Sequence, residues 1–136
     1  MAHHTNLKKD STEGAEKDMQ KFLSSSQYDY SNIFMYERCF GQGFMSAGGL
    51  DTTAEYISML NLKRSEGSPP LKVLDVGSGV CGSAFYLALT FGASVTALDL
   101  STTTTSLAKR RVPPEISHLV TFELGDALDM EYEDCT

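Results

Sequence analysis

The sequence predicts an α/β fold in which helices alternate with the strands of a parallel sheet. From Leu71 onward, three short apolar runs alternate with two stretches of helical periodicity, in the order strand, helix, strand, helix, strand. Strands that alternate with helices at this spacing form a βαβαβ unit with parallel strands. A glycine-rich turn joins the first run to the first helix, and open parallel sheets bind ligands beside such turns.

The composition limits the classes of protein that remain. The 136 residues are 41% apolar and 21% charged, which predicts one domain at most, with a packed core. A net charge of −7 argues against a nucleic-acid or anionic-membrane partner. No apolar run is long enough to span a membrane, and the polar N-terminus lacks the apolar region of a secretory signal. The three cysteines lack CxxC spacing, which predicts reduced thiols in a cytoplasmic protein and no metal site: Cys39, Cys81 and Cys135.

Two segments precede the predicted sheet. Residues 1–26 are polar and are expected to form a flexible tail, with one weak helix near Ala15–Leu23. Residues 27–62 are expected to form a helical lid. The polar run Asn61–Pro70 separates the lid from the sheet, because its two final prolines bar a helix and favour an extended chain.

Two helices are predicted within the lid. Ser31 would cap the first, and Gly41 would stop it. Asp51 would cap the second, which would run through Leu60. Apolar side chains of the lid are expected to pack inward on the sheet, namely Ile33, Phe34, Phe40 and Phe44, with Ala54 and Ile57 from the second helix.

The elements of the sheet follow in order. Gly92 closes the apolar first helix, while Ser101 is a favourable N-cap for the second helix, whose C-terminal end is basic. The predicted elements are a strand at Leu71–Val76, a helix at Ser83–Phe91, a strand at Ser94–Leu98, a helix from Ser101 through Arg111 and a strand at His118–Leu124.

The turn after the first strand has the pattern G-x-G-x-x-G, formed by Gly77, Gly79 and Gly82. Glycines suit such a turn because it is tight and because a ligand approaches its backbone closely. Asp99 ends the second strand, 22 residues beyond Gly77, where a carboxylate can accept the hydroxyls of a ribose. Asp126 follows the third strand, where a carboxylate can accept an adenine amine. A turn with no ligand, a nicotinamide dinucleotide site and an S-adenosylmethionine site all remain open at this point.

The residue before the glycine loop favours one of these ligands. Dinucleotide-binding enzymes usually carry a small or apolar residue where this chain has Asp75. The run Asp75-Val76-Gly77-Ser78-Gly79 resembles motif I of class I S-adenosylmethionine-dependent methyltransferases. The strand ends at Asp99 and Asp126 look like the second and third motifs of that family. The resemblance implies a Rossmann-like parallel sheet and S-adenosyl-L-methionine as cofactor, with S-adenosyl-L-homocysteine as product.

The lid narrows the resemblance further. The segment Gln27–Thr53 carries Gln-Tyr, Tyr-Glu, Phe-Gly, Phe-Met-Ser and Gly-Gly-Leu in an order that resembles the phosphoethanolamine N-methyltransferases. Such enzymes methylate phosphoethanolamine to phosphocholine, which feeds phosphatidylcholine synthesis. The resemblance implies phosphoethanolamine and its methylated forms as small-molecule substrates.

The resemblance also implies roles for individual residues. Tyr28 matches the family's catalytic lid tyrosine, and Tyr36 matches a residue of the substrate pocket. A tyrosine can orient the attacking amine, and aromatic faces suit a methylated cation. The expected cofactor contacts are Met45, Ser46, Asp75, Gly77, Gly79, Asp99, Leu100, Asp126 and Ala127.

The chain is short for the family that it resembles. A class I methyltransferase looks like a seven-stranded sheet, whereas residues 71–136 supply three strands, a partial cofactor-binding domain. The family's catalytic histidine would lie beyond Thr136. We therefore expect that this chain alone has no activity and self-associates through the edge of its first strand. The alternatives are a module that binds cofactor without turnover, a regulatory fragment, or another small-molecule class I methyltransferase.

Overall fold

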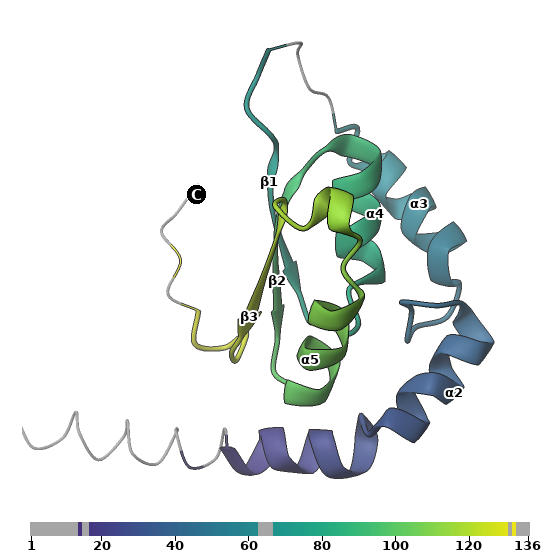
Figure 1. The fold of residues 1–136 in the computed structure, drawn as a ribbon, viewed down its shortest axis with the longest axis vertical. Coiled ribbons are helices and arrows are strands. Elements are labelled where there is room, and N and C mark those ends of the chain that lie inside the picture. The colour runs from purple at the N-terminus through teal and green to yellow at the C-terminus, as the bar shows by residue number, and fades with distance from the viewer. Residues whose placement is uncertain (1–13, 15–16, 63–66, 131, 133–136) are drawn as a thin grey trace, which may run out of the picture.

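The computed structural model describes Gly14, residues 17–62 and 67–130, and Tyr132 (Figure 1). Three parallel strands form one sheet in the order β1-β2-β3, with helices between them. The predicted α/β fold with a βαβαβ unit is therefore confirmed. The elements are η1 (Leu23–Gln27), α2 (Tyr30–Phe40), α3 (Gly49–Met59), β1 (Lys72–Val76), α4 (Gly82–Phe91), β2 (Ser94–Asp99), α5 (Thr102–Arg111), η2 (Pro114–Ile116) and β3 (Val120–Leu124).

The core lies between the sheet and the helices that cover one of its faces. Figure 1 shows α4 and α5 on the same side of the sheet, with α3 outside α4. Val95 and Ala97 of β2 and Ala84 of α4 are almost fully buried in this core. Ile57 of α3 joins the same cluster, and the Tyr56 hydroxyl donates to Ser83 Oγ at 3.0 Å. Burial of these apolar side chains holds α3 to the sheet domain.

The other face of β1 is open to solvent. Leu74 and Val76 are 39% and 46% exposed, and β1 lies at one edge of the sheet. An apolar run of this kind is typical of a strand buried on both faces. Within the described residues, β1 has neither a strand on its outer side nor a helix over this face.

The lid helices begin at other residues than predicted. Asp29, not Ser31, is the N-cap of α2, because the Asp29 side chain accepts a hydrogen bond from the Asn32 N–H at 2.8 Å. The N-cap of α3 is Gly48, in the left-handed conformation, so the prediction that Asp51 caps this helix was wrong. Asp51 instead lies in the first turn, where its negative charge is favourable.

The remaining boundaries differ by one or two residues. Residues 17–22 are helical and continue into η1, so helical structure extends to Gln27, beyond the weak helix expected near Ala15–Leu23. β1 begins at Lys72, and a short helix, η2, precedes β3. Ser101 is the N-cap of α5 as predicted, accepting from the Thr104 N–H at 3.4 Å, and α5 ends at Arg111. Within the described ranges, no helix has the length and apolar character required to cross a membrane.

Candidate functional site

A cavity of about 320 Å³ lies where the lid meets the C-terminal end of β1. This volume is within the range of small-molecule sites. Its wall is formed by residues 28 and 36 of the lid, by the turn 41–48, and by the glycine loop, which lies about forty residues further along the sequence. The lining residues are Tyr28, Tyr36, Gly43, Phe44, Met45, Ser46, Asp75, Gly77, Ser78, Gly79, Val80, Gly82 and Ser83. Seven of the predicted site residues therefore share one cavity.

The glycine loop leaves its backbone accessible at Gly77. The Gly77 and Ser78 N–H groups both donate to the Leu98 carbonyl, at 2.8 and 3.1 Å, which ties the turn to β2. Gly77 has φ +70, and a Cβ there would meet no protein atom within 4 Å. A side chain is disfavoured at this backbone angle, and the empty space beside it permits a close approach by a ligand.

The third glycine of the loop has a different role from the one predicted. A Cβ on Gly82 would lie 2.3 Å from the Gly43 carbonyl oxygen and 2.8 Å from the Phe44 ring. The Gly82 N–H donates to the same Gly43 oxygen at 2.9 Å. Gly82 is therefore required for the contact with the 41–48 turn, while Gly79 makes room for the Met45 side chain. The motif by itself does not reveal this role, because the contact joins segments about forty residues apart.

Asp75 lines the cavity, and one of its carboxylate oxygens has no hydrogen-bond partner within the part of the chain that the structure describes. Its Oδ2 atom is buried and accepts no hydrogen bond from the described residues. Burial of the carboxyl, with a smaller contribution from the charge of Asp99, raises the pKa of Asp75 to about 6. Such an atom is costly to bury unless a ligand provides the missing donor. The cavity therefore suits a ligand with a cationic or N–H group at this point.

Asp99 lies at the end of β2 and is already engaged by the protein. Its Oδ2 accepts from the Gly79 N–H at 2.7 Å, and its Oδ1 accepts from Ser101 N–H at 2.8 Å and from the Thr104 hydroxyl at 2.9 Å. A carboxylate has about four acceptor positions, so roughly one remains free. A ribose that donates both hydroxyls to Asp99 must displace one of these donors. The predicted ribose role is thus compatible with the position of Asp99, but it requires a local rearrangement.

The other predicted cofactor residues lie along the same edge of the sheet, outside the first cavity. Asp126 lines a second cavity of about 260 Å³ after β3, and its Oδ1 accepts from the Leu128 N–H at 2.9 Å. Leu98 also lines this second cavity, while its carbonyl holds the glycine loop. Leu100 is half-buried after β2, and Ala127 is exposed after Asp126. Their cofactor roles stay predictions.

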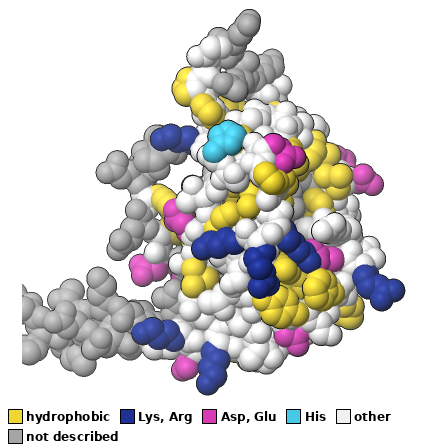
Figure 2. All heavy atoms as spheres, viewed as in Figure 1, with side chains coloured by type: hydrophobic (Ala, Val, Ile, Leu, Met, Phe, Trp, Pro, Cys, Tyr) yellow, Lys and Arg dark blue, Asp and Glu magenta, His cyan; other side chains and the backbone are white. Residues whose placement is uncertain are grey.

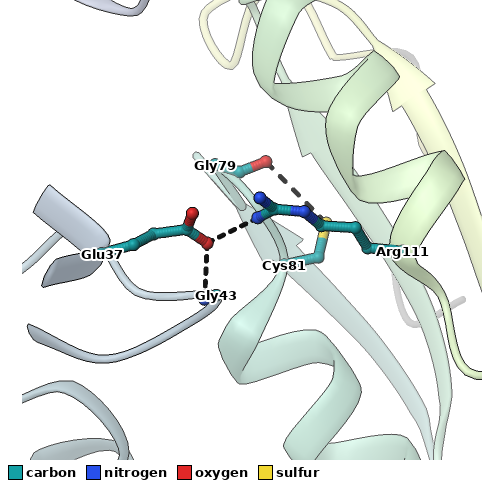
Figure 3. Close-up of polar contacts among 5 residues, drawn as sticks. All are labelled: Glu37, Gly43, Gly79, Cys81 and Arg111. Carbon is teal, nitrogen blue, oxygen red and sulfur yellow. Dashed lines mark hydrogen bonds and ion pairs between the residues drawn. The ribbon is translucent and has the colours of Figure 1, made fainter. Parts of the chain in front are cut away.

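Sequence reasoning missed a partly buried ion pair between the lid and the sheet domain. Arg111 Nη1 contacts Glu37 Oε1 at 2.6 Å, and the same Oε1 accepts from the Gly43 N–H at 2.7 Å (Figure 3). The only sequence signal was a single acid in an aromatic-rich helix. Figure 3 also shows the Cys81 thiol near the Gly79 carbonyl. Burial raises the pKa of Cys81 to about 12, so its thiol is unreactive.

One side of α2 carries aromatic rings that lie beside basic side chains of α5. Figure 2 shows Lys and Arg side chains gathered near hydrophobic ones over the C-terminal end of α5. The guanidinium groups of Arg110 and Arg111 lie over the rings of Tyr30 and Phe34, each at 5.6 Å. Phe34 is 48% exposed, so the prediction that it packs on the sheet was wrong. It contacts a cation instead, which is a favourable partner for an aromatic face.

The sequence of the chain is similar to those of known methyltransferases. Residues 73–136 match the family described as Methyltransferase domain. The chain is 43% identical to phosphoethanolamine N-methyltransferase 3 of Arabidopsis thaliana over 121 residues, covering 89% of this chain and 24% of that protein. It is 32% identical to phosphoethanolamine N-methyltransferase of Plasmodium falciparum (isolate 3D7) over 111 residues, covering 82% of this chain and 39% of that protein.

A solved structure agrees with the fold. It is phosphoethanolamine N-methyltransferase 2 of Haemonchus contortus in complex with phosphomonomethylethanolamine and S-adenosylhomocysteine. The match has a TM-score of 0.76 and 33% identity, and it covers 84% of this chain and 26% of that one. The chain thus spans about a quarter of the length of the plant and nematode proteins named here.

Proposed function

Because the chain is a relative of the phosphoethanolamine N-methyltransferases, with residues 73–136 in the methyltransferase-domain family, we propose that it binds S-adenosylmethionine for N-methylation of phosphoethanolamine. The observation that carries this proposal is the cavity in which two lid tyrosines face the glycine loop and Asp75. The solved relative from Haemonchus contortus is in complex with a methylated phosphoethanolamine and with the demethylated cofactor.

The residues of the cavity fit the cofactor. The unpartnered Asp75 oxygen suits the ammonium group of its methionine part, and the open side of Gly77 accommodates a ligand against the backbone. Asp99 would accept a ribose hydroxyl, while Asp126, Leu100 and Ala127 would lie toward the adenine. Met45 and Ser46 would close the cavity from the lid side. When bound, the cofactor supplies a methyl group on a sulfonium centre.

The lid tyrosines would bind the other reactant. Tyr28 and Tyr36 line the same cavity as Asp75, so an amine bound between them lies near the end of β1. The Tyr28 hydroxyl would orient that amine and relay its proton to water, taking the amine proton as it releases its own, because only a neutral amine can attack. The aromatic faces would favour the cation that forms with each methylation. Residues 27–62 would thus act as a substrate lid on the partial domain formed by residues 71–136.

Calorimetry with S-adenosylhomocysteine tests the proposed function on this chain. We expect one site in the wild type, no binding of NAD, and a loss of about 1–3 kcal/mol of binding free energy in Asp99→Ala, because a buried hydroxyl of the ribose loses its acceptor. Tyr28→Phe should bind S-adenosylhomocysteine like the wild type, since its hydroxyl serves the amine. No binding to the wild type, or preferential binding of NAD, would contradict the proposal.

We further propose that the chain self-associates through β1. The Leu71 carbonyl accepts from the Ser94 N–H, and the Gly77 N–H donates to the Leu98 carbonyl, so the backbone groups at both ends of β1 face β2. Backbone groups alternate in direction along a strand, so every second residue, starting with the one after Leu71, turns its N–H and C=O away from β2. Leu74 is such a residue, and its side chain is 39% exposed. An unpaired strand with apolar side chains favours pairing with another chain.

Cys39 and Cys81 are free thiols, which supports the proposed cytoplasmic location.

Leu74→Lys should shift the chain toward the monomer in size-exclusion chromatography with light scattering. A lysine on an edge strand opposes pairing because it would be buried without a partner charge. Leu128→Lys is the matched control, because Leu128 is 94% exposed and lies outside β1. Equal oligomer populations in Leu74→Lys and Leu128→Lys would contradict the role of β1. A wild type that is monomeric at all concentrations would contradict self-association itself.

A further inference from the structure

The Glu37 carboxylate joins three elements at one buried point. Glu37 lies near the C-terminal end of α2, and its side chain is 7% exposed. One oxygen, Oε1, accepts from Arg111 Nη1 at the end of α5 and from the Gly43 N–H of the 41–48 turn (Figure 3). A carboxylate withdrawn from water is destabilising unless its partners replace the lost hydration. Both partners here are donors, and one of them carries a full positive charge.

The turn that Glu37 holds forms one wall of the cavity. Gly43 donates its N–H to Glu37 and accepts from the Gly82 N–H through its carbonyl, at 2.9 Å. Two and three residues later, Met45 and Ser46 line the cavity. Met45 also reaches Gly79, since a Cβ built on that glycine would lie 2.9 Å from the Met45 methyl carbon. The position of Gly43 therefore determines where this wall lies relative to the glycine loop.

Through Glu37, Arg111 connects the 41–48 turn to a helix that is packed on the sheet. Arg111 is the last residue of α5, a helix packed on β2 and β3, and its guanidinium also lies over the Phe34 ring of α2. A charge-assisted hydrogen bond is about twice as strong as a neutral one, and burial strengthens it further. Arg111 thus fixes Glu37 relative to the sheet, and Glu37 fixes the turn.

We propose that Glu37 is a positioning residue that, with Arg111, holds the 41–48 turn against the glycine loop and so places the Met45–Ser46 wall of the cavity. Glu37 does not line the cavity, so it would act on a ligand only through this turn. The part of this inference that concerns ligand affinity rests on the proposed function. The part that concerns the turn is independent of any ligand.

Hydrogen–deuterium exchange on the ligand-free chain tests the effect on the turn. Glu37→Gln keeps the shape of the side chain but removes its charge, and we expect exchange within residues 41–48 to become about tenfold faster. Arg111→Gln should act in the same way, while Arg111→Lys keeps the charge and should restore part of the protection. Exchange within 41–48 in the double variant should be no faster than in either single variant, because both substitutions break the same ion pair. Glu55→Gln, on exposed Glu55 of α3, is the matched control.

Two outcomes would overturn the proposal on exchange alone. The first is Glu37→Gln exchanging within 41–48 at the rate of Glu55→Gln. The second is equally faster exchange at β2 amides such as Val95, which would indicate a general loss of stability. Calorimetry with S-adenosylhomocysteine then separates the two hypotheses. If the wild type binds, Glu37→Gln should bind about five- to tenfold more weakly, and equal affinity would overturn the positioning role. If the wild type does not bind, the proposed function fails, and the exchange result alone decides the role of Glu37.

Discussion

Replacing Gly82 by alanine should detach the 41–48 turn from the glycine loop. The added Cβ would lie 2.3 Å from the Gly43 carbonyl oxygen, a distance that no backbone atom can tolerate. The two segments must separate, and the hydrogen bond from Gly82 N–H to Gly43 is then lost. We expect the free energy of unfolding to fall by about 1–3 kcal/mol, the usual cost of overpacking. Urea unfolding followed by circular dichroism measures this change.

Gly77→Ala is the matched control for Gly82→Ala. Its Cβ would meet no protein atom within 4 Å, so only the positive φ opposes the substitution, at a cost of about 1 kcal/mol. Gly77 lines the cavity, however, and the new methyl group would occupy space that the ligand needs. Gly77→Ala should therefore weaken binding of S-adenosylhomocysteine while leaving exchange within 41–48 unchanged. If exchange within 41–48 is as slow in Gly82→Ala as in the wild type, the close contact of Gly82 with Gly43 is not required to hold the turn.

Acidification should weaken cofactor binding through Asp75. With a pKa of about 6 in the ligand-free chain, this carboxyl is mostly protonated at pH 5.5 and mostly ionised at pH 7.5. Only the ionised form can pair with the ammonium group of the cofactor. We expect the affinity for S-adenosylhomocysteine to fall about fourfold from pH 7.5 to pH 5.5 by this group alone. Asp75→Asn should bind weakly at both pH values and lose most of this dependence.

The same carboxyl should have the opposite effect on the stability of the ligand-free chain. Its folded pKa is raised above the ordinary value of 3.8, so the stabilisation that it contributes is complete below pH 3.8 and is lost as the pH rises through about 6. At pH 7.5, Asp75→Asn should therefore be more stable than the wild type, by about 1–2 kcal/mol after allowance for partial solvation. Thermal unfolding at pH 7.5 measures the difference. A variant that is less stable than the wild type at this pH would contradict the unpartnered state of Asp75 Oδ2.

The local features of the site follow from the sequence because they depend on neighbouring residues. Ser101 is the N-cap of α5 since its side chain accepts from an N–H three residues later, which sequence spacing predicts. The prediction that Ser31 caps α2 was wrong because a second suitable cap lies nearby. Asp29 stands two residues earlier and competes for the same kind of N–H, and residue preference alone does not choose between two good caps.

Sequence alone determined the parallel βαβαβ order, the glycine turn after β1, the acid at the end of β2 and the acid after β3. These depend on periodicity and on the rule that the carboxyl ends of parallel strands share one edge. Only the tertiary structure decided that Gly82 makes room for Gly43, that Asp99 is already engaged by three donors, and that Glu37 pairs with Arg111. The physical reason is that each of these includes at least one contact between residues remote in the chain, such as that of Gly79 with Asp99. Their distances and burial are determined by packing, which no local pattern encodes.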